Sequence, residues 1–121
     1  MRLIDSNILI YAAQPEYPFL KELLEQEDVA VSELTKLEVL GYRYLTDEAE
    51  EYFNAVFSLV TVLTISTEII DRATLLRRQS NMKSADAVIA ATALLHCTEL
   101  ITRNTRDFDH IPDLTINNPI D

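Results

Sequence analysis

Four carboxylates in this chain of 121 residues occupy positions that could support catalysis. Asp5 and Asp107 follow short apolar runs of the kind that form buried strands. Glu38 and Asp86 lie within segments of helical period, where apolar neighbours recur three and four residues away. A lone buried carboxylate is unfavourable, so we expect each of them to have a cation or a hydrogen-bond donor as partner.

Together, the four carboxylates would offer the hard oxygen ligands that Mg²⁺ and Mn²⁺ bind. A metal held in this way lowers the pKa of a bound water and neutralises charge on a phosphate under in-line attack. A remaining carboxylate can then orient or deprotonate that water. Such a site needs no nucleophilic side chain, which suits a chain with one Cys and two His.

Each carboxylate also has a simpler explanation when it is taken alone. Asp5 and Asp107 are typical turn or cap residues, because both stand among other turn formers. Asp86 could merely stabilise the start of a helix, where the dipole favours an acid. Glu38 could lie on an exposed helix face if the phase of its segment differs from the one assumed.

Short apolar runs alternate along the chain with segments of helical period, which predicts the elements that position these acids. We expect strands over residues 3–4, 29–31, 60–65, 100–102 and 114–116. We expect helices that end near residues 12, 26, 44, 59, 79 and 95, three of them capped by Ser6 or Asn7, by Ser32 and by Ser84. The alternation predicts an α/β fold, one domain over residues 1–121 with a parallel β-sheet flanked by helices on both faces. Ligands of such sheets bind beyond the carboxyl ends of the strands, where Asp5 and Asp107 would lie.

The composition excludes several classes of protein. A single Cys rules out a disulfide framework and a Cys-built zinc site, and a single Gly rules out a glycine-rich phosphate loop. The longest apolar runs fall short of the roughly 20 residues that cross a bilayer. Asp5 comes too early for a secretory signal, so we expect a soluble cytoplasmic protein without a membrane partner.

The net charge of −10 argues against a nucleic-acid partner until its distribution is considered. Residues 16–71 carry 13 acidic and 3 basic side chains, whereas residues 72–106 carry 6 basic and 2 acidic ones. The basic segment contains one of the candidate carboxylates, so the overall charge does not exclude RNA. Candidate RNA-binding residues flank the two C-terminal acids, and they are Lys83, Arg103 and Arg106.

Four stretches of the chain, in the same order and with similar spacing, resemble the PIN domain family, in particular the toxin ribonucleases of the VapBC type. They are residues 5–11, 32–40, 83–93 and 100–108, and the resemblance covers essentially the whole chain. It implies that the acids of the metal site are Asp5, Glu38 and Asp86, with Asp107 as a fourth. It also implies that small polar groups line the site, namely Ser6, Thr35, Thr102 and Asn104. Some members have an acid where this chain has Asn104, so either Asn104 or Asp107 could complete the site.

The resemblance further implies an Mg²⁺- or Mn²⁺-dependent endoribonuclease that leaves 5′-phosphate and 3′-hydroxyl ends. It implies a homodimer and a cognate antitoxin protein whose tail covers the acidic pocket, with DNA bound only indirectly through that antitoxin. An RNA-processing nuclease without an antitoxin and a catalytically silent binding module are the alternatives. The three core acids favour an enzyme, because an abandoned site has no need of buried carboxylates.

Overall fold

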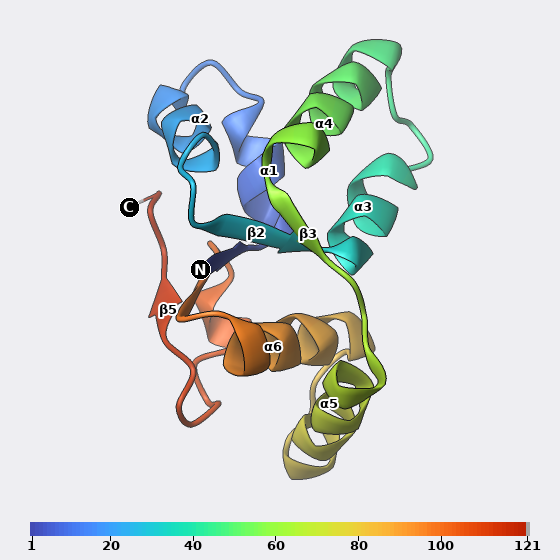
Figure 1. Ribbon diagram of the computed structural model, residues 1–121, viewed down its shortest axis with the longest axis vertical. Helices are drawn as coiled ribbons and strands as arrows, with labels where there is room; N and C mark the ends of the chain where they lie inside the picture. The colour runs from blue at the N-terminus through green and yellow to red at the C-terminus, as the bar shows by residue number, and fades with distance from the viewer. Residues whose placement is uncertain (121) are drawn as a thin grey trace.

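A five-stranded sheet forms the centre of the computed structural model, which describes residues 1–120 (Figure 1). Its strands are β1 (Arg2–Ile4), β2 (Val29–Ser32), β3 (Thr61–Leu63), β4 (Glu99–Ile101) and β5 (Ile116–Asn117). They lie in the order β3-β2-β1-β4-β5, and each neighbouring pair is parallel. Leu3 of β1 pairs in register with Ala30 of β2 and with Leu100 of β4.

Helices cover both faces of this sheet (Figure 1). One layer contains α1 (Ser6–Ala12), α2 (Pro18–Leu24), α3 (Glu33–Leu40) and α4 (Asp47–Leu59). The other layer contains α5 (Thr67–Gln79) and α6 (Ser84–His96), and a short 3₁₀ helix, η1 (Thr105–Asp107), follows β4. The α/β fold expected from the sequence is therefore confirmed.

Two hydrophobic cores form because successive strand residues point to opposite faces of the sheet. Leu3 packs in the core beneath α5 and α6, whereas Ile4 packs in the core beneath α1 to α4, and neither is accessible to solvent. The strands are apolar on both faces for this reason, as parallel strands between two helical layers usually are.

Several expected element ends differ from those observed. Asp5 caps α1, in place of Ser6 or Asn7, because one of its carboxylate oxygens accepts the Ser6 N–H at 2.9 Å. The cap position of α6 is Lys83, and Ser84 is already helical. Helix α3 is capped by Ser32, as expected, but it ends at Leu40 instead of near residue 44.

Gly41 explains the early end of α3. A side chain at this position would clash with the carbonyl oxygen of Leu37, so the close approach at the helix end requires glycine. Within residues 1–120, no helix combines the length and the apolar character needed to span a membrane.

Candidate active site

The centre of the sheet is the point where the chain changes direction. Strand β1 continues to β2 on one side, whereas β4 joins the sheet on the other side of β1. Asp5 directly follows β1 and Thr102 directly follows β4, and the Asp5 N–H donates to the Ile101 carbonyl at 2.9 Å. Open α/β sheets bind ligands beyond the strands at such a point. These two residues therefore mark the expected position of a site.

Asp5 is 7% exposed, and its carboxylate accepts hydrogen bonds from three donors. One oxygen accepts from the Ser6 N–H, and the other accepts from Asn7 Nδ2 at 3.0 Å and from the Thr102 hydroxyl at 2.8 Å. These bonds fix the orientation of a side chain that is buried with little freedom to move.

Asn7 is a site residue that the sequence analysis did not identify as one. Its amide nitrogen lies 3.2 Å from Thr102 Oγ1, and its amide oxygen accepts the Arg103 N–H at 3.0 Å. Thr102 Oγ1 also accepts the Asn104 N–H at 3.1 Å. Asn7 thus joins the first turn of α1 to the loop after β4. The spacing Asp-x-Asn at a helix start was the available signal.

The other three carboxylates approach Asp5 from separate elements. Glu38 lies in the last turn of α3, Asp86 in the first turn of α6 and Asp107 at the end of η1. The charges of Asp5 and Asp86 act on Glu38, and the charge of Asp107 acts on both Asp5 and Asp86. The structure therefore brings the four predicted acids into one electrostatic cluster.

The expectation that Glu38 and Asp86 occupy apolar, buried helix positions is only partly right. Asp86 is half-buried, whereas Glu38 is exposed as a whole residue. The neighbours of Glu38 explain the difference, because Leu37 is 68% exposed and Tyr42 is 59% exposed. The apolar residues of this segment do not all point into the core, so their spacing did not identify which face of the helix is buried.

Burial is the main cause that raises the pKa of Asp5, of Glu38 and of Asp86 above their ordinary values. Repulsion from neighbouring carboxylates raises the pKa of all three further. Hydrogen bonds oppose the rise in the pKa of Asp5, and the Ser6 side chain opposes it at Glu38 through a hydrogen bond. The nearby charge of Lys83 opposes it at Asp86.

This donor set fits a hard divalent cation in its chemistry. Within residues 1–120 none of the four acids makes a salt bridge, so their mutual repulsion is not neutralised by a direct ion pair. Oxygen ligands with this unbalanced negative charge are the kind that Mg²⁺ and Mn²⁺ bind. In their present rotamers, however, no three acidic, imidazole or thiol side chains of the described residues converge on one ion position. Binding would therefore require side-chain rotation.

The predicted small polar residues contact the site to different degrees. Ser6 and Thr102 contact the carboxylates directly, and Asn104 contributes its backbone N–H. Thr35 is fully buried one turn before Glu38, and its hydroxyl has no hydrogen-bond partner within residues 1–120. The structure therefore does not connect Thr35 to the acids by a hydrogen bond.

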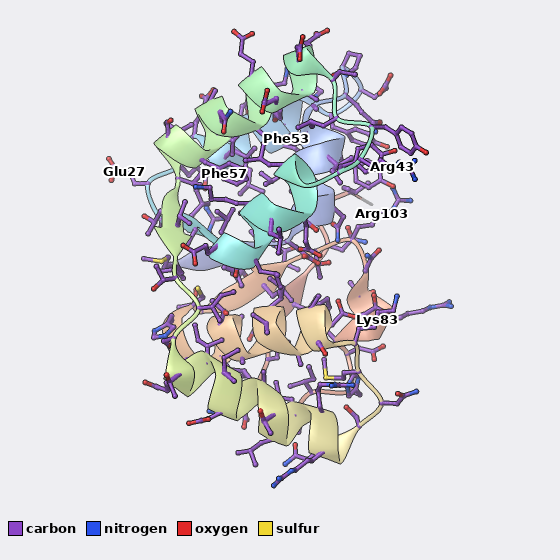
Figure 2. The ribbon with its side chains drawn as sticks, turned by 90° about the vertical axis from the view of Figure 1, so that its right-hand side faces the viewer. Glu27, Arg43, Phe53, Phe57, Lys83 and Arg103 are labelled. Carbon is purple, nitrogen blue, oxygen red and sulfur yellow. The ribbon has the colours of Figure 1, made fainter. Side chains whose placement is uncertain are left out.

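The three predicted RNA-binding residues line two cavities that share Arg106 and Asp107. Lys83 and Arg106 line a polar cavity together with Asp86 and Asp107. The guanidinium of Arg103 lies over the Tyr11 ring, 4.8 Å from its centroid. Figure 2 shows Arg103 beside the layer of α1 to α4 and Lys83 on the layer of α5 and α6. Arg103 lines the other of these two cavities together with Arg106 and Asp107.

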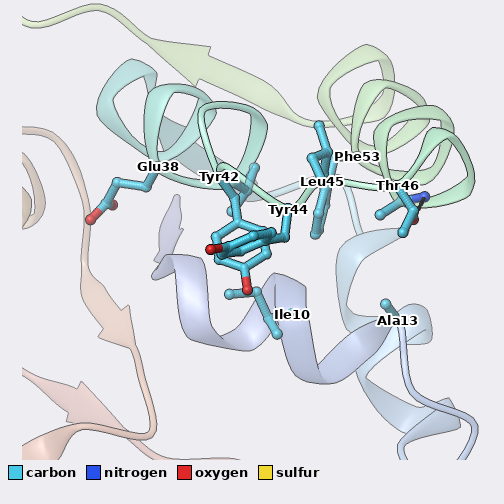
Figure 3. A pocket seen from close by; sticks show the side chains of 10 residues that line it. Ile10, Ala13, Glu38, Tyr42, Tyr44, Leu45, Thr46 and Phe53 are labelled. Atoms are coloured by element: carbon cyan, nitrogen blue, oxygen red, sulfur yellow. Dashed lines mark hydrogen bonds between the residues drawn. The ribbon is translucent and has the colours of Figure 1, made fainter.

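An apolar groove of about 540 Å³ adjoins the acids on the other side. It lies between α1, α3 and α4, and the rings of Tyr42 and Tyr44 stand over Ile10 in its centre (Figure 3). Glu38 stands at one end of the groove, with its carboxylate directed away from the two rings (Figure 3). The groove therefore connects an exposed aromatic surface to the acidic cluster.

Comparison with known proteins agrees with this geometry. The sequence model of the PIN domain family matches residues 2–114. Ribonuclease VapC19 of Mycobacterium tuberculosis is 36% identical over 126 aligned residues, which cover 94% of this chain and 97% of that protein. A toxin–antitoxin complex from Klebsiella pneumoniae contains a similar chain, with 35% identity, a TM-score of 0.79 and 98% of each chain covered. FitAcB from Neisseria gonorrhoeae is similar too, with 25% identity, a TM-score of 0.78 and 98% of each chain covered.

Proposed function

The chain belongs to the PIN domain family, and on this premise we propose that it is an endoribonuclease, the toxin of a toxin–antitoxin pair. The observation that carries the proposal is the gathering of Asp5, Glu38, Asp86 and Asp107 at the centre of the sheet. It is supported by the similarity to a ribonuclease over nearly the full length of the chain. We place the activity in one domain over residues 1–121 of a cytoplasmic protein.

Asp5, Glu38 and Asp86 would hold Mg²⁺ or Mn²⁺, which when bound supplies Lewis-acid stabilisation of charge on the reacting phosphate. Thr102 and Asn7 hold the Asp5 carboxylate in place by hydrogen bonds of 2.8 and 3.0 Å. Asp5 is thus preorganised as a ligand, because these hydrogen bonds already fix its rotamer, whereas Glu38 and Asp86 would have to rotate towards an ion.

Asp107 is the acid that we assign to the attacking water. It is exposed at the end of η1, where solvent reaches it, and its charge acts on both Asp5 and Asp86. In the reaction the water oxygen bonds to phosphorus and the bond from phosphorus to O3′ breaks. The proton of the water passes to Asp107, and solvent supplies the proton of the leaving oxygen.

The apolar groove is the proposed docking site of the antitoxin. Tyr42 is 59% exposed, Tyr44 is 67% exposed and Ile10 is 49% exposed, which together form a large apolar surface beside the acids. The chain carries a net charge of −10, so a basic partner is electrostatically favoured. An antitoxin segment lying in the groove reaches the acidic cluster at Glu38 and blocks it. We further propose that the toxin is a homodimer and contacts DNA only through the antitoxin.

Co-expression tests the proposal directly. Induction of the chain should arrest growth, the Asp5→Ala variant should not arrest it, and the product of the neighbouring upstream gene should relieve the arrest. Arrest without relief by any neighbouring gene would favour an RNA-processing nuclease, and the absence of arrest would contradict a toxin.

A control within the groove separates docking from catalysis. Tyr44→Ala should weaken relief by the antitoxin while growth arrest by the toxin alone persists. Equal relief of the Tyr44→Ala variant and the unsubstituted toxin would contradict docking at this groove.

A further inference from the structure

A second cavity lies on the opposite side of the acids from the apolar groove. It measures about 550 Å³ and opens between the end of α5, the start of α6 and the loop around η1. Two of the candidate catalytic acids form part of its wall, and basic or imidazole side chains form much of the remainder. These residues are Asp86, Asp107, Arg77, Lys83, Arg106 and His110.

Arg77 is the cation of this cavity whose side chain makes a hydrogen bond within residues 1–120. It lies in the last turn of α5, and its Nε donates to the Met82 carbonyl at 3.1 Å. This bond uses one nitrogen of the guanidinium, and within residues 1–120 the two terminal nitrogens have no hydrogen-bond partner and can bind a ligand. A planar guanidinium fixed in this way can bind two oxygens of one phosphate.

The charge pattern of the cavity favours a ligand that continues past the acids. A small free anion would be attracted by Arg77, Lys83 and Arg106 but repelled by Asp86 and Asp107 beside them. A polynucleotide can place one phosphate at the catalytic centre, where a divalent cation held by the acids would offset their charge, while the next phosphate lies among the cations of the cavity. Because cations and acids line the same cavity, the cavity fits a chain of successive phosphates.

We propose that this cavity binds the RNA phosphate adjacent to the one that is cleaved, with Arg77 as the positioning residue. Lys83 and Arg106 add positive charge, and Arg77 supplies the fixed geometry. The proposal rests on the ribonuclease function proposed above and names the part of the substrate that this cavity contacts. Arg77 lies outside the four stretches that resemble the PIN domain family, so no motif in the chain indicated this role.

Steady-state cleavage of a single-stranded oligoribonucleotide with one mapped cut site provides the first test. Arg77→Met should raise KM about tenfold, the scale of one lost charge-assisted hydrogen bond, while kcat changes little. The slope of log affinity against log salt should fall by about 0.7, as expected for one lost phosphate contact on a single strand. Arg78→Met is the matched control, because Arg78 is exposed in the same helical turn and does not line the cavity.

The changes in kcat and KM distinguish the loss of a phosphate contact from a structural effect of the substitution. Loss of the bond from Arg77 to Met82 could disturb the start of α6 and hence Asp86, and this would lower kcat. Arg77→Lys keeps the charge and serves as a second variant in case Arg77→Met does not fold. A fall in kcat with an unchanged KM in either variant would overturn the proposal.

An uncharged linkage in place of one phosphate of the RNA shows which phosphate Arg77 contacts. A methylphosphonate at the phosphate next to the cut should slow cleavage by the unsubstituted protein about tenfold. It should have little further effect on Arg77→Met, because the two changes remove the same interaction. Equal penalties in both proteins at every flanking position would overturn the proposal but leave the ribonuclease function intact.

Two further outcomes show whether the inference about the cavity or the proposed ribonuclease function is wrong. If Arg77→Met cleaves RNA normally but binds the antitoxin less tightly, the cavity contacts the antitoxin and the proposal is wrong. If the unsubstituted protein cleaves no RNA with Mg²⁺ or Mn²⁺, the proposed function fails and the inference fails with it.

Discussion

The hydroxyl of Thr102 is predicted to control the charge of Asp5. Thr102 is fully buried, and it donates to the Asp5 carboxylate at 2.8 Å, which opposes the rise in pKa that burial causes. A hydrogen bond to a charged group contributes roughly 1.5–3 kcal/mol, and one pKa unit corresponds to about 1.4 kcal/mol. The Thr102→Val substitution should therefore raise the pKa of Asp5, because the bond to the charged carboxylate is stronger than the bond to the neutral carboxyl group by about 1 kcal/mol.

The same substitution should lower stability in a pH-dependent way. At pH 7, where Asp5 is charged, Thr102→Val should reduce the free energy of unfolding by about 2 kcal/mol. Below about pH 3, where Asp5 is protonated, the loss should shrink to about 1 kcal/mol, the contribution of a neutral hydrogen bond. Urea unfolding at both pH values and NMR titration of the Asp5 carboxyl group measure the two effects.

Thr92→Val provides the matched control for this experiment. Thr92 is 1% exposed, and its hydroxyl donates at 2.7 Å to the carbonyl of Val88, an uncharged partner. Its loss should cost the same at both pH values and leave the pKa of Asp5 unchanged. The reasoning is refuted if Thr102→Val leaves the pKa of Asp5 unchanged, or if its cost is equal at pH 3 and pH 7.

Three other predictions concern stability and metal binding. Without metal, the raised pKa values of Asp5, Glu38 and Asp86 stabilise the folded protein below about pH 4. This stability is lost as the pH rises through the pKa values of the folded protein, so the contribution of these acids to the free energy of unfolding falls towards pH 7. Urea unfolding at several pH values should show a smaller fall in Asp86→Asn, and an equal or larger fall would contradict the assignment. Mn²⁺ at about 100 times its Kd should raise the free energy of unfolding by about 2.7 kcal/mol, and a comparable rise in Asp86→Asn would place the ion elsewhere. Phe108→Ala, at a side chain 1% exposed, should cost about 3–5 kcal/mol in urea unfolding, whereas Phe19→Ala, at one 44% exposed, should cost about 1 kcal/mol or less.

The parts of the fold that depend on burial were predictable from the sequence. Leu3 and Ile4 are both inaccessible to solvent, and a run that is apolar on both sides indicates a strand between two layers. The cap of α1 was not predictable, because Asp5, Ser6 and Asn7 are all good cap residues at adjacent positions. Only the direction of the chain after β1 decides among them.

The candidate site was likewise predictable from the sequence only in part. The acids could be recognised because a carboxylate within a helical apolar pattern is unusual, although the spacing overstated the burial of Glu38. Tyr42 stands four residues after Glu38 yet faces solvent, so periodicity does not distinguish a core face from an exposed apolar face. The contacts of Asn7 with Thr102 and of Arg77 with Met82 depend on the folded backbone. No local sequence rule indicates them.

Cleavage of RNA by the purified chain tests the central claim most directly. We expect cleavage in Mg²⁺ or Mn²⁺ with 5′-phosphate and 3′-hydroxyl products. We also expect complete loss of cleavage in EDTA and in Asp86→Asn, while the circular dichroism spectrum of the variant stays unchanged. Cleavage that is undiminished by EDTA and by Asp86→Asn would contradict it.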